Sequence, residues 1–202
     1  MIAGTVSLAT YLWVVRPYFL RWGTTDAEVK RTLLGDELVP NPKTGYTQAI
    51  TINVPPEKVW PWIVQIGYQR GGWYTYDWFY QLTKSGNFVD GHSANRIISE
   101  LQMVKVGDII RIHAEGPYTI AHLEPNRAMV LQAKDDVAPM NISWAFILEP
   151  LGSHVTRLVV RNRTDYGSDP GMGLFLTAFT DGGALIMQPK MLKGIKQRSE
   201  TL

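Results

Sequence analysis

The stretch NISWAFILEPLGSHVTRLVVRNR, residues 141–163, decides the fold. Apolar residues alternate along both sides of the turn sequence PLGSH, which predicts two antiparallel strands joined as a hairpin. If residues of equal parity pair across the turn, Trp144 and Phe146 share one face of the sheet with Val160. We therefore predict that this face is the apolar one.

The opposite face of the second strand carries a row of arginines: Arg157, Arg161 and Arg163. We interpret this face as exposed to solvent, with its arginines paired to carboxylates such as Glu149 and Asp108. The alternative is a row of cations that faces anionic lipid.

The sequence before the hairpin predicts further strands of the sheet, and the sequence after it predicts a helix that covers the sheet. Three apolar runs that end at turn residues precede the hairpin and predict a meander: VGDIIRIH (106–113), YTIAHLEP (118–125) and RAMVLQAK (127–134). After the hairpin, apolar residues spaced three or four apart predict a long helix from Gly171 to Arg198. We expect Gly182-Gly183 and Pro189 to interrupt this helix.

Further upstream, the sequence predicts a first strand and two short helices. YTQAITINV (46–54) alternates as a half-buried strand does, with Gln48 as the one polar residue on its apolar face. A helix should begin at Pro56, and a second should cover Asp77 to Lys84. The predicted class is therefore α+β: a curved antiparallel sheet wrapped around a long C-terminal helix, with two short helices after the first strand. One helix seldom fills a wide concave face, so we expect a cavity.

The N-terminus differs in kind from the rest of the chain. Residues 1–21 form an apolar helix with no charge from Ile2 to Val15, and the basic residues come only after it. We interpret it as a possible membrane anchor that leaves the protein on the cytoplasmic side of the cell membrane. The alternative is a helix docked on its own domain or on a partner, in a cytoplasmic protein. A short helix and linker, residues 22–45, should follow, with Thr25 and Glu28 as a capping box.

Composition excludes several classes of function. The net charge is only +2, which argues against a nucleic-acid partner. The chain has no cysteine, and its four histidines show no zinc-like spacing, so we expect neither a metal nor a cofactor.

Several phrases together carry a family resemblance: ITINVPPEKVWPWIVQIG, RGGWYTYD, GDIIRI, WAFILEPL, TRLVVRNR and KMLKGIK. In these phrases and in the order of its elements, the chain resembles the SRPBCC superfamily, which includes START-like lipid-transfer domains and polyketide cyclases. It is most similar to bacterial membrane-linked SRPBCC proteins whose function is uncharacterised. The resemblance covers residues 22–198 and implies a helix-grip domain over residues 46–198. It also implies a deep, mostly apolar cavity that binds small hydrophobic molecules.

An aromatic stretch, RGGWYTYDWFYQL at residues 70–82, offers the best candidates for the wall of such a cavity. Aromatic side chains combine a large apolar area with a polar tip, and we expect Trp73, Tyr74 and Tyr76 to line the cavity. Trp144 and Phe146 on the hairpin are the matching candidates from the sheet. The alternative is that these aromatics only fill the core.

Charged residues beside the aromatics raise two further hypotheses. Arg70 either pairs with Asp77 or anchors the acidic head group of a ligand at the cavity mouth. Asp77 and His92 are weak candidates for an acid–base pair; the alternative is that Asp77 caps a helix and His92 a loop.

Three functions remain open on this evidence. We favour a carrier or sensor that binds a small lipid-like or polyketide-like molecule near the membrane and catalyses nothing. The alternative is an enzyme of the cyclase or dehydratase type that uses the same cavity, with Asp77 and His92 as its acid–base groups. The third is an interaction domain whose cavity has collapsed.

Overall fold

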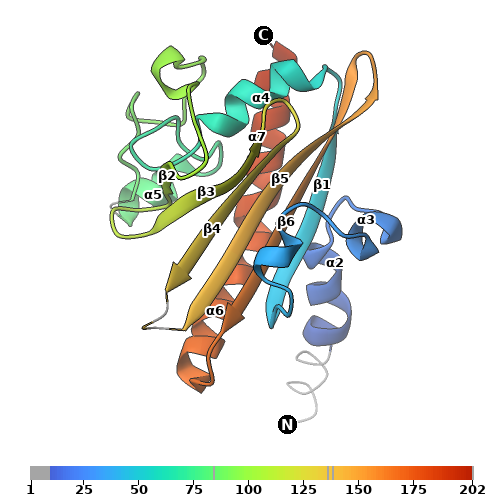
Figure 1. Ribbon diagram of the computed structural model, residues 1–202, viewed down its shortest axis with the longest axis vertical. Helices are drawn as coiled ribbons and strands as arrows, with labels where there is room; N and C mark the ends of the chain where they lie inside the picture. The colour runs from blue at the N-terminus through green and yellow to red at the C-terminus, as the bar shows by residue number, and fades with distance from the viewer. Residues whose placement is uncertain (1–9, 84, 136, 138, 202) are drawn as a thin grey trace.

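The computed structural model describes residues 10–83, 85–135, 137 and 139–201. Within these residues an antiparallel sheet curves around a long C-terminal helix, and shorter helices lie at its sides (Figure 1). This is the α+β helix-grip arrangement that the sequence predicts.

The strands follow the predicted meander. Those in the described part of the chain are β1 (Thr44–Ile52), β2 (Ile109–Arg111), β3 (Pro117–Glu124), β4 (Ala128–Asp135), β5 (Met140–Gly152) and β6 (Val155–Tyr166). They lie in the order β1-β6-β5-β4-β3-β2, and every neighbouring pair is antiparallel. In the hairpin, Phe146 lies opposite Val160 and Trp144 lies opposite Asn162, so equal parities pair as predicted.

Short helices connect the strands. Those between β1 and β2 are α4 (Pro56–Val64), α5 (Asp77–Leu82) and the 3-10 turn η3 (Ser99–Leu101). α4 begins at the predicted proline and contains Pro61. α5 ends two residues earlier than predicted, at Leu82.

The C-terminal helix continues through the positions where we expected interruptions. Its three parts are α6 (Pro170–Gly182), the π-helical segment η4 (Gly183–Met187) and α7 (Gln188–Thr201). Gly182 and Gly183 both keep right-handed helical dihedral angles. The glycine pair and the proline therefore coincide with a local change of helix type, a feature often found at functional sites.

A buried glutamine explains how the helix tolerates its proline. Pro189 lacks the N–H that a π-helical ladder would offer to the carbonyl of Ala184. Gln48 donates to that carbonyl instead, with Nε2 at 2.7 Å, and donates to the carbonyl of Phe19 at 2.6 Å. The one polar residue on the apolar face of β1 thus joins the N-terminal and C-terminal helices to the sheet.

The sheet packs on both faces. The larger core lies between the sheet and the C-terminal helix, and it includes Trp62, Phe146 and Leu192. A smaller core on the other face contains Val130 and Val159 and is covered by residues 33–38.

This second layer corrects our interpretation of the arginine row. Residues 22–40, with α3 (Asp26–Lys30) and the 3-10 turn η2 (Asp36–Leu38), cross the face on which we expected solvent (Figure 1). Arg157 Nε lies 2.7 Å from Glu28 Oε1, and Arg161 Nη1 lies 2.6 Å from Asp36 Oδ2. The predicted carboxylate partners are therefore wrong, because the sequence does not show which segment folds over this face.

The capping box that begins α3 is confirmed. Thr25 Oγ1 accepts from the Glu28 backbone N–H at 3.3 Å, and Glu28 Oε2 accepts from the Thr25 backbone N–H at 2.7 Å. The hydrogen bond from Arg157 lowers the pKa of Glu28 to about 2, against the opposing effect of burial. One carboxylate therefore both caps α3 and holds it to β6.

The N-terminal segment docks on the domain where the structure describes it. The π-helical η1 (Tyr11–Val15) leads into α2 (Arg16–Leu20). Arg16 donates from Nε to Asp181 Oδ2 at 2.6 Å and from Nη2 to Asp181 Oδ1 at 3.0 Å, which ties α2 to α6. Phe19 is buried. Among residues 10–201 as described, no helix is both long and apolar enough to cross a membrane. The rest of the predicted anchor, residues 1–9, lies outside the described residues.

A candidate ligand cavity

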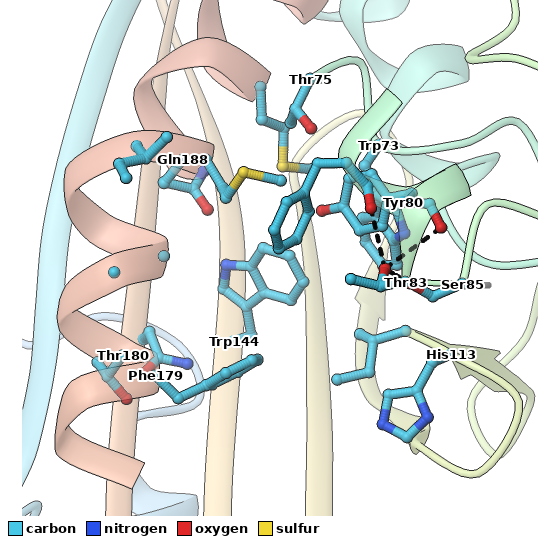
Figure 2. A pocket seen from close by; sticks show the side chains of 18 of the residues that line it. Trp73, Thr75, Tyr80, Thr83, Ser85, His113, Trp144, Phe179, Thr180 and Gln188 are labelled. Atoms are coloured by element: carbon cyan, nitrogen blue, oxygen red, sulfur yellow. Dashed lines mark hydrogen bonds between the residues drawn. The ribbon is translucent and has the colours of Figure 1, made fainter. Parts of the chain in front are cut away.

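A cavity of about 1020 Å³ lies between the sheet and the middle of the C-terminal helix. Figure 2 shows its walls, with Trp144 from β5 between the helix and the aromatic stretch. The sheet contributes Tyr46, Tyr118, Ile142, Trp144, Asn162 and Thr164. The C-terminal helix contributes residues of α6, η4 and α7 from Ala178 to Met191. The π-helical segment therefore forms part of the cavity wall.

A tight turn brings the aromatic stretch to the cavity. Gly72 has a backbone φ of +83°, which residues other than glycine rarely adopt. A Cβ at this position would lie 2.8 Å from Cα of Ser93. Tyr74 also has a positive φ, of 57°. The turn places Trp73 in the cavity wall, while Tyr74 is buried outside it. Only glycine fits this close approach at residue 72.

Exposure separates the floor of the cavity from its mouth. The lining side chains that are buried form the floor: Trp73, Tyr118, Ile142, Thr164, Thr180, Gln188 and Met191. The most exposed large apolar side chains of the lining lie at the mouth: Trp78 on α5 (64% exposed), Phe179 on α6 (57%) and Ile186 on η4 (53%). An apolar molecule could therefore enter between α5 and the C-terminal helix.

The predicted wall residues divide into two groups. Trp73, Tyr76 and Trp144 line the cavity, and the rings of Trp73 and Trp144 are stacked with centroids 5.7 Å apart. Tyr74 and Phe146 lie outside the lining, contrary to prediction. Alternation along a chain shows which face a residue occupies but does not show how deep it lies.

Each of the two aromatics outside the lining has a structural role. The hydroxyl of Tyr74 donates to the carbonyl of Trp62 at 3.1 Å, and burial raises the pKa of Tyr74 above its usual range. A Cβ on Gly194 of α7 would lie 2.3 Å from the Tyr74 carbonyl oxygen, so the helix approaches this residue closely. Phe146 packs behind Trp144, with ring centroids 4.9 Å apart. Both residues support the wall from behind.

Arg70 does not anchor a ligand in this structure. Its guanidinium donates to the backbone carbonyls of Val64, Ile66 and Leu101 at 2.8, 3.0 and 3.3 Å. Burial lowers its pKa, and it lies outside the cavity lining. The expected ion pair with Asp77 does not form, because carbonyl groups of neighbouring turns occupy the guanidinium.

Asp77 and His92 do not form an acid–base pair. Asp77 accepts hydrogen bonds from the backbone N–H and the hydroxyl of Ser93, at 2.8 and 2.6 Å. His92 Nδ1 donates to the carbonyl of Ser93 at 2.9 Å. Neither side chain lines the cavity. His92 holds a loop, as in the alternative, but Asp77 does not cap α5, because both of its hydrogen bonds go to Ser93 and α5 has no side-chain cap.

Sequence reasoning missed the polar side chains in the wall. The hydroxyl of Tyr46 donates to Gln188 Oε1 at 3.0 Å, and burial raises the pKa of this tyrosine well above its usual range. Burial also raises the pKa of Tyr80, to about 12. His113 and Glu115 lie among the lining residues that precede β3. Gln188 carried one available signal, since it is a polar residue beside the apolar spacing of the final helix.

The described residues contain no group of three acidic or histidine side chains that could hold a metal ion.

Comparison with known proteins finds no matching family model and no matching curated protein. The chain is similar to several solved structures. One is a protein of Mesorhizobium loti, at 18% identity and a TM-score of 0.44, over 77% of this chain and 96% of that one. A hypothetical protein of Helicobacter pylori has 13% identity and a TM-score of 0.49, over 87% and 98%. The di-domain ARO/CYC protein BexL of the BE-7585A biosynthetic pathway has 12% identity and a TM-score of 0.43, over 78% and 46%.

Proposed function

We propose that this protein binds a small hydrophobic molecule in the cavity and acts as a carrier or sensor near a membrane. The observation that carries the proposal is the cavity itself, about 1020 Å³ with a buried aromatic floor and an exposed apolar mouth. Drug-sized ligands occupy concave, mostly apolar sites of roughly 300–1,000 Å³ with few polar groups. A collapsed interaction domain would have filled this space with side chains.

The placement of Asp77 and His92 favours a carrier over an enzyme that would use these two residues as its acid–base groups. Asp77 and His92, the predicted acid–base groups, hold a loop and do not line the cavity. A general base must reach the proton that it removes, and neither group is placed to do so. We therefore expect Asp77→Asn and His92→Gln to leave ligand binding close to that of the parent protein.

Titration with Nile red, a neutral dye whose fluorescence rises in apolar surroundings, tests the proposal. We expect saturable binding at one dye per chain and displacement of the dye by molecules extracted from freshly purified protein. Mass spectrometry of the extract then identifies the natural ligand. A protein that binds no dye at any concentration in the micromolar range would contradict the proposal.

Membrane association is part of the proposal and draws support from one end of the molecule. The N-terminal segment leaves Trp13 and Tyr18 81% and 72% exposed, and Phe175 of α6 is also exposed. Figure 1 shows α2 and α6 at the same end of the molecule as the N-terminus. Exposed aromatic side chains are typical of surfaces that sit at the lipid–water interface. We propose that this end meets the membrane, on its cytoplasmic side.

Replacing both Trp13 and Tyr18 by serine tests the membrane contact without removing the Arg16–Asp181 pair. We expect binding to phosphatidylcholine vesicles to weaken at least about tenfold, because two large apolar surfaces no longer enter the interface. Sedimentation with vesicles measures this. Leu151→Ser, an exposed change near the end of β5 in the hairpin at the other end of the molecule, is the control. Parent protein that stays in the supernatant would rule out the contact.

A further inference from the structure

The floor of the cavity holds hydrogen-bond donors that no described residue satisfies. Gln188 Nε2 and Trp73 Nε1 are inaccessible to solvent and have no hydrogen-bond partner among the described residues. Gln188 and Trp73 are 3% and 2% exposed, so both side chains are almost wholly buried. Buried polar groups in native proteins nearly always have a partner, which makes two such donors in the floor of one cavity informative.

The orientation of Gln188 is fixed by a neighbour. Its Oε1 accepts the hydroxyl proton of Tyr46 at 3.0 Å, which leaves the amide nitrogen as the free group. Figure 2 shows Gln188 on the helix and Trp144 on the sheet extending toward the same space, with the indole nitrogen of Trp144 turned toward the helix. Trp144 N–H interacts with the hydroxyl of Tyr46, within the cavity wall itself. The amide nitrogen of Gln188 is therefore the donor that this group of wall residues leaves free.

The charges around the cavity restrict what these donors can bind. Among the described lining residues there is no lysine, arginine or aspartate, and Glu115 is the one carboxylate. Lys190 lies over the ring of Tyr76, with Nζ 5.7 Å from the centroid, and is not part of the lining. A buried carboxylate or phosphate would have no lysine or arginine in the described lining to compensate its lost hydration. A neutral acceptor needs only the N–H groups that are present.

We infer that the ligand is a neutral carbonyl compound, such as a ketone, quinone or ester, whose oxygen accepts a hydrogen bond from Gln188 Nε2. This inference rests on the proposed function and specifies the class of ligand. A purely hydrocarbon ligand would leave Gln188 Nε2 without a partner, and a fatty acid would bury its charge with no lysine or arginine in the described lining.

A matched pair of ligands tests the inference: 9-fluorenone, and fluorene, which has CH₂ in place of the carbonyl group. Affinities are measured by displacement of Nile red from the parent protein and from Gln188→Met. We expect the preference for 9-fluorenone over fluorene to fall about five- to tenfold in Gln188→Met, the usual effect of one hydrogen bond. Comparing the ratio between proteins cancels the different hydration of the two compounds.

Two further variants make the result decisive. Leu185→Ala changes an exposed position of the neighbouring segment η4 outside the lining, so the preference should stay within about twofold of the parent value. If Gln188→Met does not fold because Tyr46 loses its acceptor, the double variant Tyr46→Phe/Gln188→Met removes both partners, which is usually tolerated. The double variant should show the same five- to tenfold fall.

The outcomes separate this inference from the proposed function. If both compounds bind and the preference is the same in every variant, the donors are satisfied by water and the inference is overturned, while the proposed function stands. Tighter binding of 9-fluorenecarboxylate than of 9-fluorenone would also overturn it. If neither fluorene nor 9-fluorenone displaces the dye, and the dye itself does not bind, both the proposed function and the inference fail.

Discussion

Replacing Asp36 by alanine should lower the free energy of unfolding by about 3–5 kcal/mol, the usual cost of removing one partner of a buried ion pair. Asp36 Oδ2 lies 2.6 Å from Arg161 Nη1, and the Arg161 side chain is only 5% exposed. The other contacts of this guanidinium are neutral, with Thr47 and with backbone carbonyls of residues 28–31. The variant would leave a buried cation without a counter-charge. Urea unfolding at neutral pH measures the effect.

Two further variants distinguish this cause from a general loss of packing. Asp26→Ala removes the exposed partner of Arg21 in the same segment and should leave the unfolding midpoint close to the parent value. The double variant Asp36→Ala/Arg161→Met removes both charges and should recover most of the lost stability, because no unpaired charge remains. A loss below about 1 kcal/mol in Asp36→Ala would contradict our description of this pair.

Replacing Phe179 by alanine should weaken Nile red binding about ten- to seventyfold. Phe179 lines the mouth of the cavity and is 57% exposed, so most of its ring is free to contact a ligand. Losing roughly 60–100 Å² of apolar contact costs about 1.5–2.5 kcal/mol of binding free energy at about 25 cal/mol per Å². Because the ring contributes little to the core, the unfolding midpoint should change far less than the affinity.

Leu174→Ala provides the matched control on the same helix. Leu174 is 73% exposed and does not line the cavity. It should leave Nile red affinity within about twofold of the parent protein, as expected for a surface position without ligand contact. Equal losses in both variants would mean that the dye binds the outer face of α6 and not the cavity.

The sequence predicted the sheet well because strand pairing depends on local alternation and on turn chemistry. The parity rule placed Phe146 opposite Val160, as the structure shows. It failed for the arginine row, where a distant segment carrying Glu28 and Asp36 covers the face. The parity rule also does not explain why the polar Gln48 lies on the apolar face of β1, because its hydrogen-bond partners come from the N-terminal and C-terminal helices. Long-range covering of one element by another leaves no periodic signal.

The candidate site was predicted in outline. Aromatic clustering identified Trp73 and Tyr76, and alternation identified Trp144. Tyr74 lies outside the cavity lining because its positive φ turns its side chain away from the direction that the neighbouring side chains take. Gln188 was missed because its one signal, a polar residue beside the apolar spacing of the helix, does not show that the side chain is buried in a cavity wall.

The most direct test of the central claim is a crystal structure of the protein grown in the presence of 9-fluorenone. We predict density for the compound inside the cavity, with its rings against Trp73 and Trp144 and its oxygen within hydrogen-bond distance of Gln188 Nε2. A cavity closed by inward movement of Phe179 and Trp78, or a compound bound only on the outer surface, would contradict the account.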